Sequence, residues 1–343
     1  MTMTNFSVPT SYASDSNAGA FPLHRPRRLR RTPALRRLAA ETTVRPSNLV
    51  QPLFVREGLT EPRPIASMPG VLQHTRDTLR KAAAEAVAAG VGGLMIFGIP
   101  LVKDGTGSGA SDPEGILQVA LRDVVAEVGE QTVVIGDINL DEYTTHGHVG
   151  VLGPDGDVDN DASLQRFAEV AVAQADAGAH VVAPSGMMDG QVRHIRAALD
   201  RAGHQQVAIL GYSAKYASSF YGPFRDAVES SLTGDRKSYQ QNPANLRESL
   251  REVALDLTEG ADMVMVKPAS YYLDIVRLLA DAVDVPVSAY QVSGEYAMVE
   301  AAAKQGWIDR DSAVVESLTC LYRAGATVLI TYWATEFAAK LPR

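Results

Sequence analysis

The sequence predicts an α/β fold, a closed (β/α)8 TIM barrel with an extended N-terminal arm. From residue 48 onward, short runs rich in β-branched and other apolar residues alternate with helical patterns at regular spacing. The alternation occurs eight times, and no stretch rich in Gly, Ser or Pro divides it. Strands that alternate with helices pair in parallel through right-handed crossovers, and eight such units close a barrel. A doubly wound open sheet is the competing architecture.

The predicted elements follow one another along the whole domain. Strands are expected at residues 49–55, 93–99, 132–139, 180–184, 207–213, 262–267, 285–292 and 327–333. Helices are expected at residues 78–89, 114–128, 162–177, 190–202, 245–259, 272–282, 296–304 and 311–323. One long connection, residues 216–241, has no helical pattern, and we call it the lid segment. Connections of this length usually cover a binding site.

The basic segment at residues 24–37, HRPRRLRRTPALRR, holds seven arginines. It is either an arm that binds nucleic acid or an arm that is solvated or contacts another subunit. Acidic and apolar residues follow it at once, and the net charge of −8 opposes nucleic-acid affinity, so the second interpretation is favoured. We predict three parts: a disordered tail at residues 1–23, an arm at 24–47 and one barrel domain at 48–343.

The composition is that of a globular protein, with 46% hydrophobic and 21% charged residues. No apolar run approaches the roughly 20 residues of a membrane helix, and the N-terminus lacks the pattern of a secretion signal. The single cysteine, Cys320, allows neither an internal disulfide nor a thiolate zinc site. We therefore expect a cytoplasmic protein that binds no membrane.

Two lysines stand at the ends of neighbouring predicted strands: Lys215 follows the fifth strand, and Lys267 ends the sixth. In a barrel the C-terminal strand ends form the active-site rim, and neighbouring strands lie about 5 Å apart. Burial and the second ammonium both disfavour the charged form, so each amine pKa should fall from about 10.4 towards neutrality. A neutral amine attacks ketones and forms an imine. The alternative for each lysine is a snorkelling or salt-bridged residue.

The lid segment supplies three cations, Arg225, Arg236 and Lys237. Guanidinium groups suit carboxylates, so beside an imine-forming lysine they favour a keto-acid substrate. Taken alone, they would be surface charges. Ser293 and Tyr332 follow the seventh and eighth strands, where their hydroxyls could bind a second carboxylate or simply the backbone.

Several separate segments carry a family resemblance: residues 25–37, 143–152, 158–164, 183–192, 212–227, 234–240, 265–277 and 290–298. These segments resemble those of the porphobilinogen synthase family, also called 5-aminolevulinate dehydratase, and the similarity runs from about residue 25 to residue 341. The resemblance implies a (β/α)8 barrel, in agreement with the strand count. It also implies a lyase that condenses two molecules of 5-aminolevulinate into porphobilinogen, for tetrapyrrole and haem synthesis, through Schiff bases on two lysines.

The resemblance implies a role for each lysine. Lys267 forms the imine with the first substrate molecule, whose carboxylate meets Ser293 and Tyr332. Lys215 forms the imine with the second, whose carboxylate meets Arg225 and Arg236. The remaining predicted site residues are Gln240 and Lys237 near the second carboxylate, Tyr221 in contact with substrate, and Asp137 and Ser185 for proton transfer or positioning.

The metal requirement departs from the family pattern. Zinc-using members carry three cysteines where this chain has Asn139, Asp141 and Val149, so no active-site zinc is expected. A magnesium ion held through oxygen at Asp141 stays open, although its two neighbours offer little support. Glu248 matches the glutamate that holds an allosteric, activating Mg2+ at subunit contacts in many bacterial members; the alternative is an ordinary surface acid. No organic cofactor is expected.

The resemblance also bears on assembly. In the family the arm wraps a neighbouring barrel, so a homo-octamer is expected, exchanging with smaller forms according to magnesium. Two other functions stay open. Another Schiff-base enzyme on a barrel, of the class I aldolase type, would need only one imine lysine and has no obvious use for Arg225 and Arg236. A non-enzymatic protein that binds nucleic acid through its arm would show steep salt dependence.

Overall fold

A computed structural model describes residues 24–341, and its contacts divide the chain between Thr43 and Val44. The predicted tail at residues 1–23 lies outside the described residues. In the first unit a short 3-10 helix (Pro26–Arg30) precedes helix α1 (Pro33–Leu38). The Thr32 hydroxyl caps α1 by accepting a hydrogen bond from the Leu35 amide at 3.1 Å. Neither helix buries a side chain within this unit.

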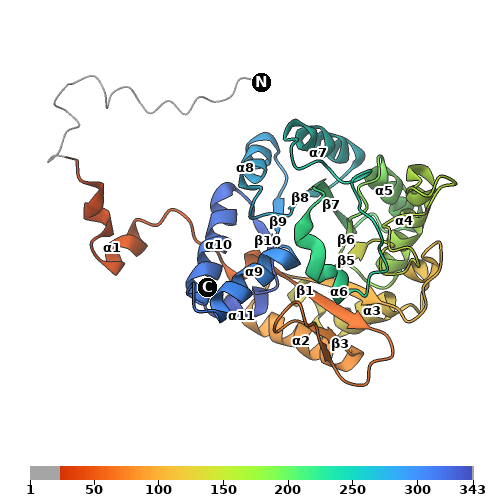
Figure 1. Ribbon diagram of the computed structural model, residues 1–343, viewed down its shortest axis with the longest axis horizontal. Coiled ribbons are helices and arrows are strands. Elements are labelled where there is room, and N and C mark those ends of the chain that lie inside the picture. Colours follow the sequence, from red (N-terminus) through yellow and green to blue (C-terminus); the bar gives the residue numbers. More distant parts are fainter. Residues whose placement is uncertain (1–23, 342–343) are drawn as a thin grey trace. The chain divides into compact units, whose positions relative to one another are not determined.

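The second unit is a closed barrel of eight parallel strands, so the predicted fold class is confirmed (Figure 1). Its strands are β1 (Leu49–Arg56), β4 (Gly93–Ile99), β5 (Val133–Ile138), β6 (Val181–Pro184), β7 (Ala208–Lys215), β8 (Met263–Lys267), β9 (Val287–Tyr290) and β10 (Val328–Ile330). Each strand pairs with the next, and β10 pairs with β1 to close the ring. The competing open sheet is excluded by this last pairing.

Helices surround the barrel as the crossovers require (Figure 1). They are α2 (Arg76–Ala89), α3 (Ile116–Val128), α4 (Asn160–Asp176), α5 (Gln191–Ala202), α7 (Arg247–Glu259), α8 (Leu273–Ala282), α9 (Ser293–Lys304), α10 (Arg310–Ala324) and α11 (Ala334–Ala338). No helix among residues 24–341 is long and apolar enough to cross a membrane.

Short elements escaped the sequence prediction. Strands β2 (Arg63–Pro64) and β3 (Leu72–His74) form a small antiparallel pair beside β1. The lid segment contains a 3-10 turn (Ser219–Tyr221) and helix α6 (Gly222–Ala227), so the expectation that it lacks helix was wrong. A six-residue helix is too short to show a repeating apolar face, which is why no periodicity marked it.

Helix α6 of the lid segment lies on the aromatic interior of the barrel. The Phe224 ring contacts Phe54 of β1 and Phe97 of β4, with centroids 5.8 and 5.3 Å apart. Phe54 and Phe97 stack on each other at 5.4 Å. The lid segment is therefore packed against the side of the barrel formed by the first two strands.

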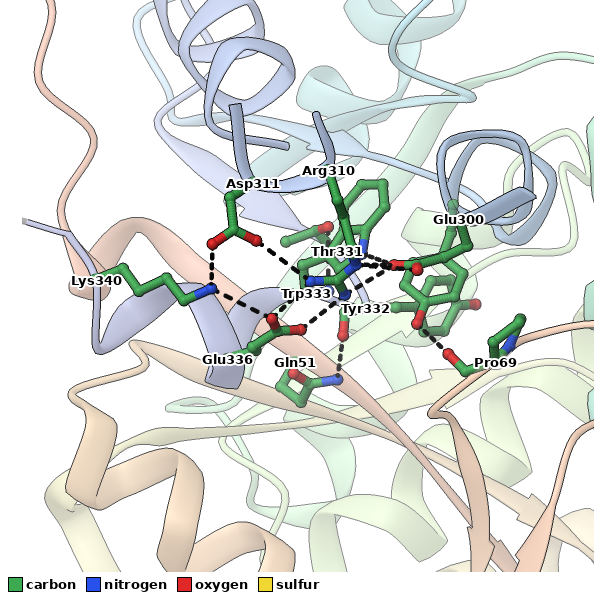
Figure 2. Close-up of polar contacts among 11 residues, drawn as sticks. Gln51, Pro69, Glu300, Arg310, Asp311, Thr331, Tyr332, Trp333, Glu336 and Lys340 are labelled. Carbon is green, nitrogen blue, oxygen red and sulfur yellow. Dashed lines mark hydrogen bonds and ion pairs between the residues drawn. The ribbon is translucent and has the colours of Figure 1, made fainter. Parts of the chain in front are cut away.

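A polar network fixes the chain just after β10 (Figure 2). The Trp333 indole donates to Glu300 of α9 at 2.6 Å. Arg310 of α10 bonds both Glu300, at 3.0 Å, and Glu336 of α11, at 2.7 Å. These bonds join three helices around Trp333, the residue that follows Tyr332.

Candidate active site

The two predicted lysines are direct neighbours across the β7–β8 ladder. Lys215 and Lys267 pair in register, at the last residue of each strand. Their exposed fractions are 4% and 7%, so both amines are buried. The structure thus brings together, at the C-terminal rim of the barrel, the two residues that the strand ends had indicated.

The environment of the lysines favours neutral amines. The pKa of Lys215 is lowered from 10.5 to about 7. Burial is the largest cause, and repulsion from the charges of Lys267 and Arg236 adds to it. Burial lowers the pKa of Lys267 to about 8, opposed by the attraction of Asp137. At pH 7 about half of Lys215 and about a tenth of Lys267 is therefore unprotonated, which is the form that attacks a ketone.

Tyr212 lies beside both amines, and the sequence analysis missed it. The Lys215 and Lys267 nitrogens lie 5.6 and 5.0 Å from the centre of its ring. Strict alternation along β7 would put residues 213 and 215 on one face, but the pairing with β8 shifts register between Gly211 and Ala214. The shift turns Tyr212 to the side of Lys215, whereas Ser213 bonds outward to Asp256 of α7.

Asp137, at the end of β5, supplies a carboxyl group next to the lysines. Its Oδ2 accepts a hydrogen bond from the Ser185 hydroxyl at 3.1 Å, and the Ser185 carbonyl accepts one from the Lys215 ammonium. Burial raises the pKa of Asp137, although both lysines oppose the rise. Its Oδ1 is buried with no partner among the described residues. The Tyr212 hydroxyl is a further hydrogen-bond partner of the Asp137 carboxyl, which lines the cavity beside both lysines. Asp137 is therefore placed to exchange a proton with a substrate.

A cavity of about 470 Å³ opens over the lysines. The site residues predicted from the sequence that line this cavity are Asp137, Ser185, Lys215, Tyr221, Arg225, Arg236, Lys237, Gln240 and Lys267. Arg225 has no ion pair within residues 24–341, and the Gln240 Nε2 is buried without a partner there. Lys237 is largely exposed and pairs with Asp235 at 3.0 Å. The cavity therefore combines two amines with several groups able to bind a carboxylate.

Arg236 is already paired with an acid. Its Nη2 lies 2.6 Å from Asp141 Oδ2 and 3.0 Å from the Gly147 carbonyl. Burial acts to raise the Asp141 pKa, but the Arg236 charge, the hydrogen bonds with Glu142 and Arg236, and the Lys215 charge together outweigh it and hold this pKa below its usual value. The adjacent Glu142, also missed in the sequence, is buried, and both burial and Asp141 raise its pKa. Asp141 thus fixes the Arg236 guanidinium at the cavity wall.

Ser293 and Tyr332 are not among the described residues that line this cavity. The Ser293 hydroxyl accepts a hydrogen bond from the Phe224 amide at 2.9 Å and lies 3.4 Å from the Phe220 carbonyl, both in the lid segment. The Tyr332 hydroxyl lies 3.2 Å from that of Tyr290. The Tyr290 ring in turn lies 4.2 Å from the Lys267 nitrogen. The Tyr332 hydroxyl is thus connected to Lys267 through Tyr290, and Ser293 bonds the backbone of Phe224, whose ring lies 5.4 Å from the Lys267 nitrogen.

The positions of the family's zinc ligands do not form a metal site. Asn139 Oδ1 accepts from the Asp141 amide at 3.1 Å, Asp141 is neutralised by Arg236, and Val149 is buried and apolar. Glu248 lies in the first turn of α7, where Asn245 donates to its Oε2 at 2.9 Å. No group of three or more His, Cys, Asp or Glu residues suited to a metal occurs in residues 24–341.

Comparisons with known proteins find one family that matches both the sequence and the fold of this chain. The family described as Delta-aminolevulinic acid dehydratase matches residues 23–340. The Delta-aminolevulinic acid dehydratase of Streptomyces coelicolor is 66% identical over 325 residues, which cover 94% of this chain and 98% of that protein. The Mycobacterium tuberculosis enzyme of the same name is 62% identical, with 94% and 98% covered. A crystal structure of the Toxoplasma gondii enzyme with the reaction product porphobilinogen has a TM-score of 0.90 at 42% identity, covering 95% of this chain and 94% of that one.

Proposed function

The chain belongs to the delta-aminolevulinic acid dehydratase (porphobilinogen synthase) family, lyases that condense two molecules of 5-aminolevulinate into porphobilinogen, and we propose that it does so through Schiff bases on Lys215 and Lys267. The observation that carries the proposal is the pairing in register of two buried lysines with pKa values near neutrality. One lysine would suffice for an aldolase. Two adjacent ones suit a reaction that holds two keto acids at once.

Each imine forms by the same steps. The neutral Nζ attacks the ketone carbon, the ketone oxygen takes up protons, and the carbinolamine loses water to leave a C=N bond. Asp137 is the group placed to move these protons, because it is buried, lines the cavity and is linked to Lys215 through Ser185. The two imine formations release both waters of the overall reaction. Carbon–carbon and carbon–nitrogen bond formation between the two substrates then displaces the two lysine amines and closes the pyrrole.

The carboxylates are held on opposite sides of the lysine pair. For the substrate on Lys215, Arg225 supplies an unpaired guanidinium, Arg236 a second one fixed by Asp141, and Gln240 a free amide. For the substrate on Lys267, Ser293 and Tyr332 supply hydroxyls, which requires Ser293 to exchange its bond with the Phe224 amide for one with the carboxylate. This exchange couples binding of the first substrate to the position of the lid segment.

Metal and assembly complete the proposal. We assign no step to an active-site metal, because Asp141 is paired with Arg236, and the other two positions, Asn139 and Val149, supply no anionic ligand. Glu248 would hold an allosteric Mg2+ together with water and groups of a second subunit, since Mg2+ keeps several waters and needs only one or two carboxylates. The arm would join subunits into an octamer. A cytoplasmic location is consistent with the lone Cys320.

Borohydride trapping tests the mechanism. The protein is incubated with 5-aminolevulinate, reduced, digested and mapped by mass spectrometry, while porphobilinogen is measured in a parallel sample. Adducts on both Lys215 and Lys267 are expected. An adduct on one lysine without any pyrrole product would instead favour an aldolase-type enzyme, and the absence of adducts would refute imine chemistry.

A further inference from the structure

Glu229 has a backbone conformation that its side chain makes unfavourable. It lies two residues beyond α6 with φ of +52°, and only Met187 shares a positive φ among the non-glycine residues in 24–341. Helices α2, α5, α7 and α10 reach this left-handed region with glycine. A residue with a Cβ is strained there, so the presence of glutamate indicates that its side chain has a role.

The Glu229 side chain joins the lid segment to the barrel. Arg56, at the end of β1, donates to its carboxylate from Nε at 2.7 Å and from Nη2 at 3.2 Å. Arg63 of β2 also pairs with the carboxylate, and Gln73 of β3 approaches it at 3.4 Å. Lys103, in the loop after β4, donates to the Glu229 carbonyl at 2.7 Å. Four side chains from four segments thus converge on one residue.

The partners of Glu229 lie on the side of the barrel opposite the strand from which the lid segment starts. The lid segment leaves the barrel at the end of β7, and in the closed ring β1 is four strands from β7 in either direction. Glu229 therefore ties the lid segment to the opposite side of the mouth. Between the two attachment points lie Phe224, which packs on Phe54 and Phe97, and Arg225, which lines the cavity.

The backbone of Glu229 is bonded to the turn that carries Arg225. The Glu229 amide donates to the Asp226 carbonyl at 3.3 Å, and the Ser230 amide donates to the Arg225 carbonyl at 2.9 Å. A displacement of Glu229 would therefore move Arg225, whose side chain has no ion pair in residues 24–341 to hold it in place. The strained turn and the ion pairs act on the same short helix.

We propose that Glu229 is a positioning residue that latches the lid segment across the barrel mouth through Arg56, Arg63 and Lys103, and so holds Arg225 over the site of the second substrate. The proposal rests on the function proposed above, in which Arg225 binds a substrate carboxylate. It predicts a loss that appears mainly in KM, because Glu229 itself touches no reacting atom.

Two substitutions separate the ion pairs from the backbone strain. Glu229→Gln keeps the shape and removes the charge, and Glu229→Gly removes the whole side chain while suiting the left-handed backbone, so this variant should fold. Asp226→Asn is the matched control, because Asp226 is an exposed acid of helix α6 with no side-chain hydrogen bond or ion pair among the described residues. We expect KM for 5-aminolevulinate to rise about tenfold in both Glu229 variants with kcat within about threefold, and no change in the control.

Limited trypsin digestion supplies a readout that does not depend on catalysis. Cleavage after Arg225, Arg236 or Lys237 should be several times faster in both Glu229 variants, at an unchanged midpoint of urea unfolding. If the Glu229→Gly variant had the same KM and digestion rate as the wild-type protein, the latch would be refuted. It would also be refuted if this variant lost kcat and stability while its KM stayed constant. If the wild-type protein formed no porphobilinogen, the proposed function would fail, while digestion would still decide whether the latch exists.

Discussion

Replacing Lys267 with methionine should raise the pKa of the Lys215 amine while leaving it below that of an ordinary lysine. The environment lowers the Lys215 pKa from 10.5 to about 7, with burial as the largest cause and the Lys267 charge as the second. Methionine keeps a long side chain of similar volume, so burial persists and only the charge is lost. Two charges on neighbouring strands, about 5 Å apart, at an effective dielectric constant of about 20 repel by up to about 3 kcal/mol, or roughly two pKa units.

The Lys267 charge contributes less than burial to the lowering of the Lys215 pKa. We therefore expect the Lys215 pKa to rise by about one unit when this charge is removed. A lysine with a lowered pKa is charged below that value and neutral above it. At pH 7 about half of Lys215 is then neutral in the wild-type protein, and about a tenth in the Lys267→Met variant. The rate of any reaction that requires the neutral amine should differ about fivefold between the two proteins at this pH.

Pulse labelling with acetic anhydride from pH 5.5 to 9.5, followed by mass mapping, measures this fraction. Labelling of Lys215 should be half-maximal near pH 7 in the wild-type protein and near pH 8 in the variant, and the exposed Lys81 normalises reagent decay in each digest. Equal midpoints in the two proteins would refute the electrostatic coupling of the lysines. A wild-type midpoint above pH 9 would refute the effect of burial as well.

Three further predictions concern the acid groups and the metal. Asp137→Asn should lower kcat by a factor of about 10² to 10⁴ and leave Lys267 adducts detectable after borohydride; unchanged single-turnover kinetics would exclude Asp137 from proton transfer. Asp141→Ala should destabilise the protein by about 3–5 kcal/mol in urea unfolding, because it leaves a buried Arg236 guanidinium without its carboxylate, and a cost below about 1 kcal/mol would show that the pair is not structural. Activity should survive a zinc-selective chelator and respond to Mg2+, and Glu248→Gln should abolish the Mg2+ response at unchanged basal activity; loss of activity on zinc removal would overturn the assignment.

Local patterns in the sequence determined the architecture and the reactive pair. Eight alternating strand and helix patterns predicted the barrel, and their limits agree with the structure to within a few residues at most strands. Lys215 and Lys267 could be placed at one rim because, in a parallel barrel, every strand ends at the same side. Chain direction alone therefore sufficed to bring them together.

Tertiary structure decided the contacts around that pair. The register shift in β7 turned Tyr212 inward, and no local pattern marks a bulge whose cause lies in the pairing with β8. Arg236 and Asp141 are 95 residues apart, and Arg56 and Glu229 are 173 apart. Charges at such separations meet only after the barrel closes. The sequence thus determined which groups reach the rim, and only the folded chain determined which of them neutralise one another and which stay free for substrate.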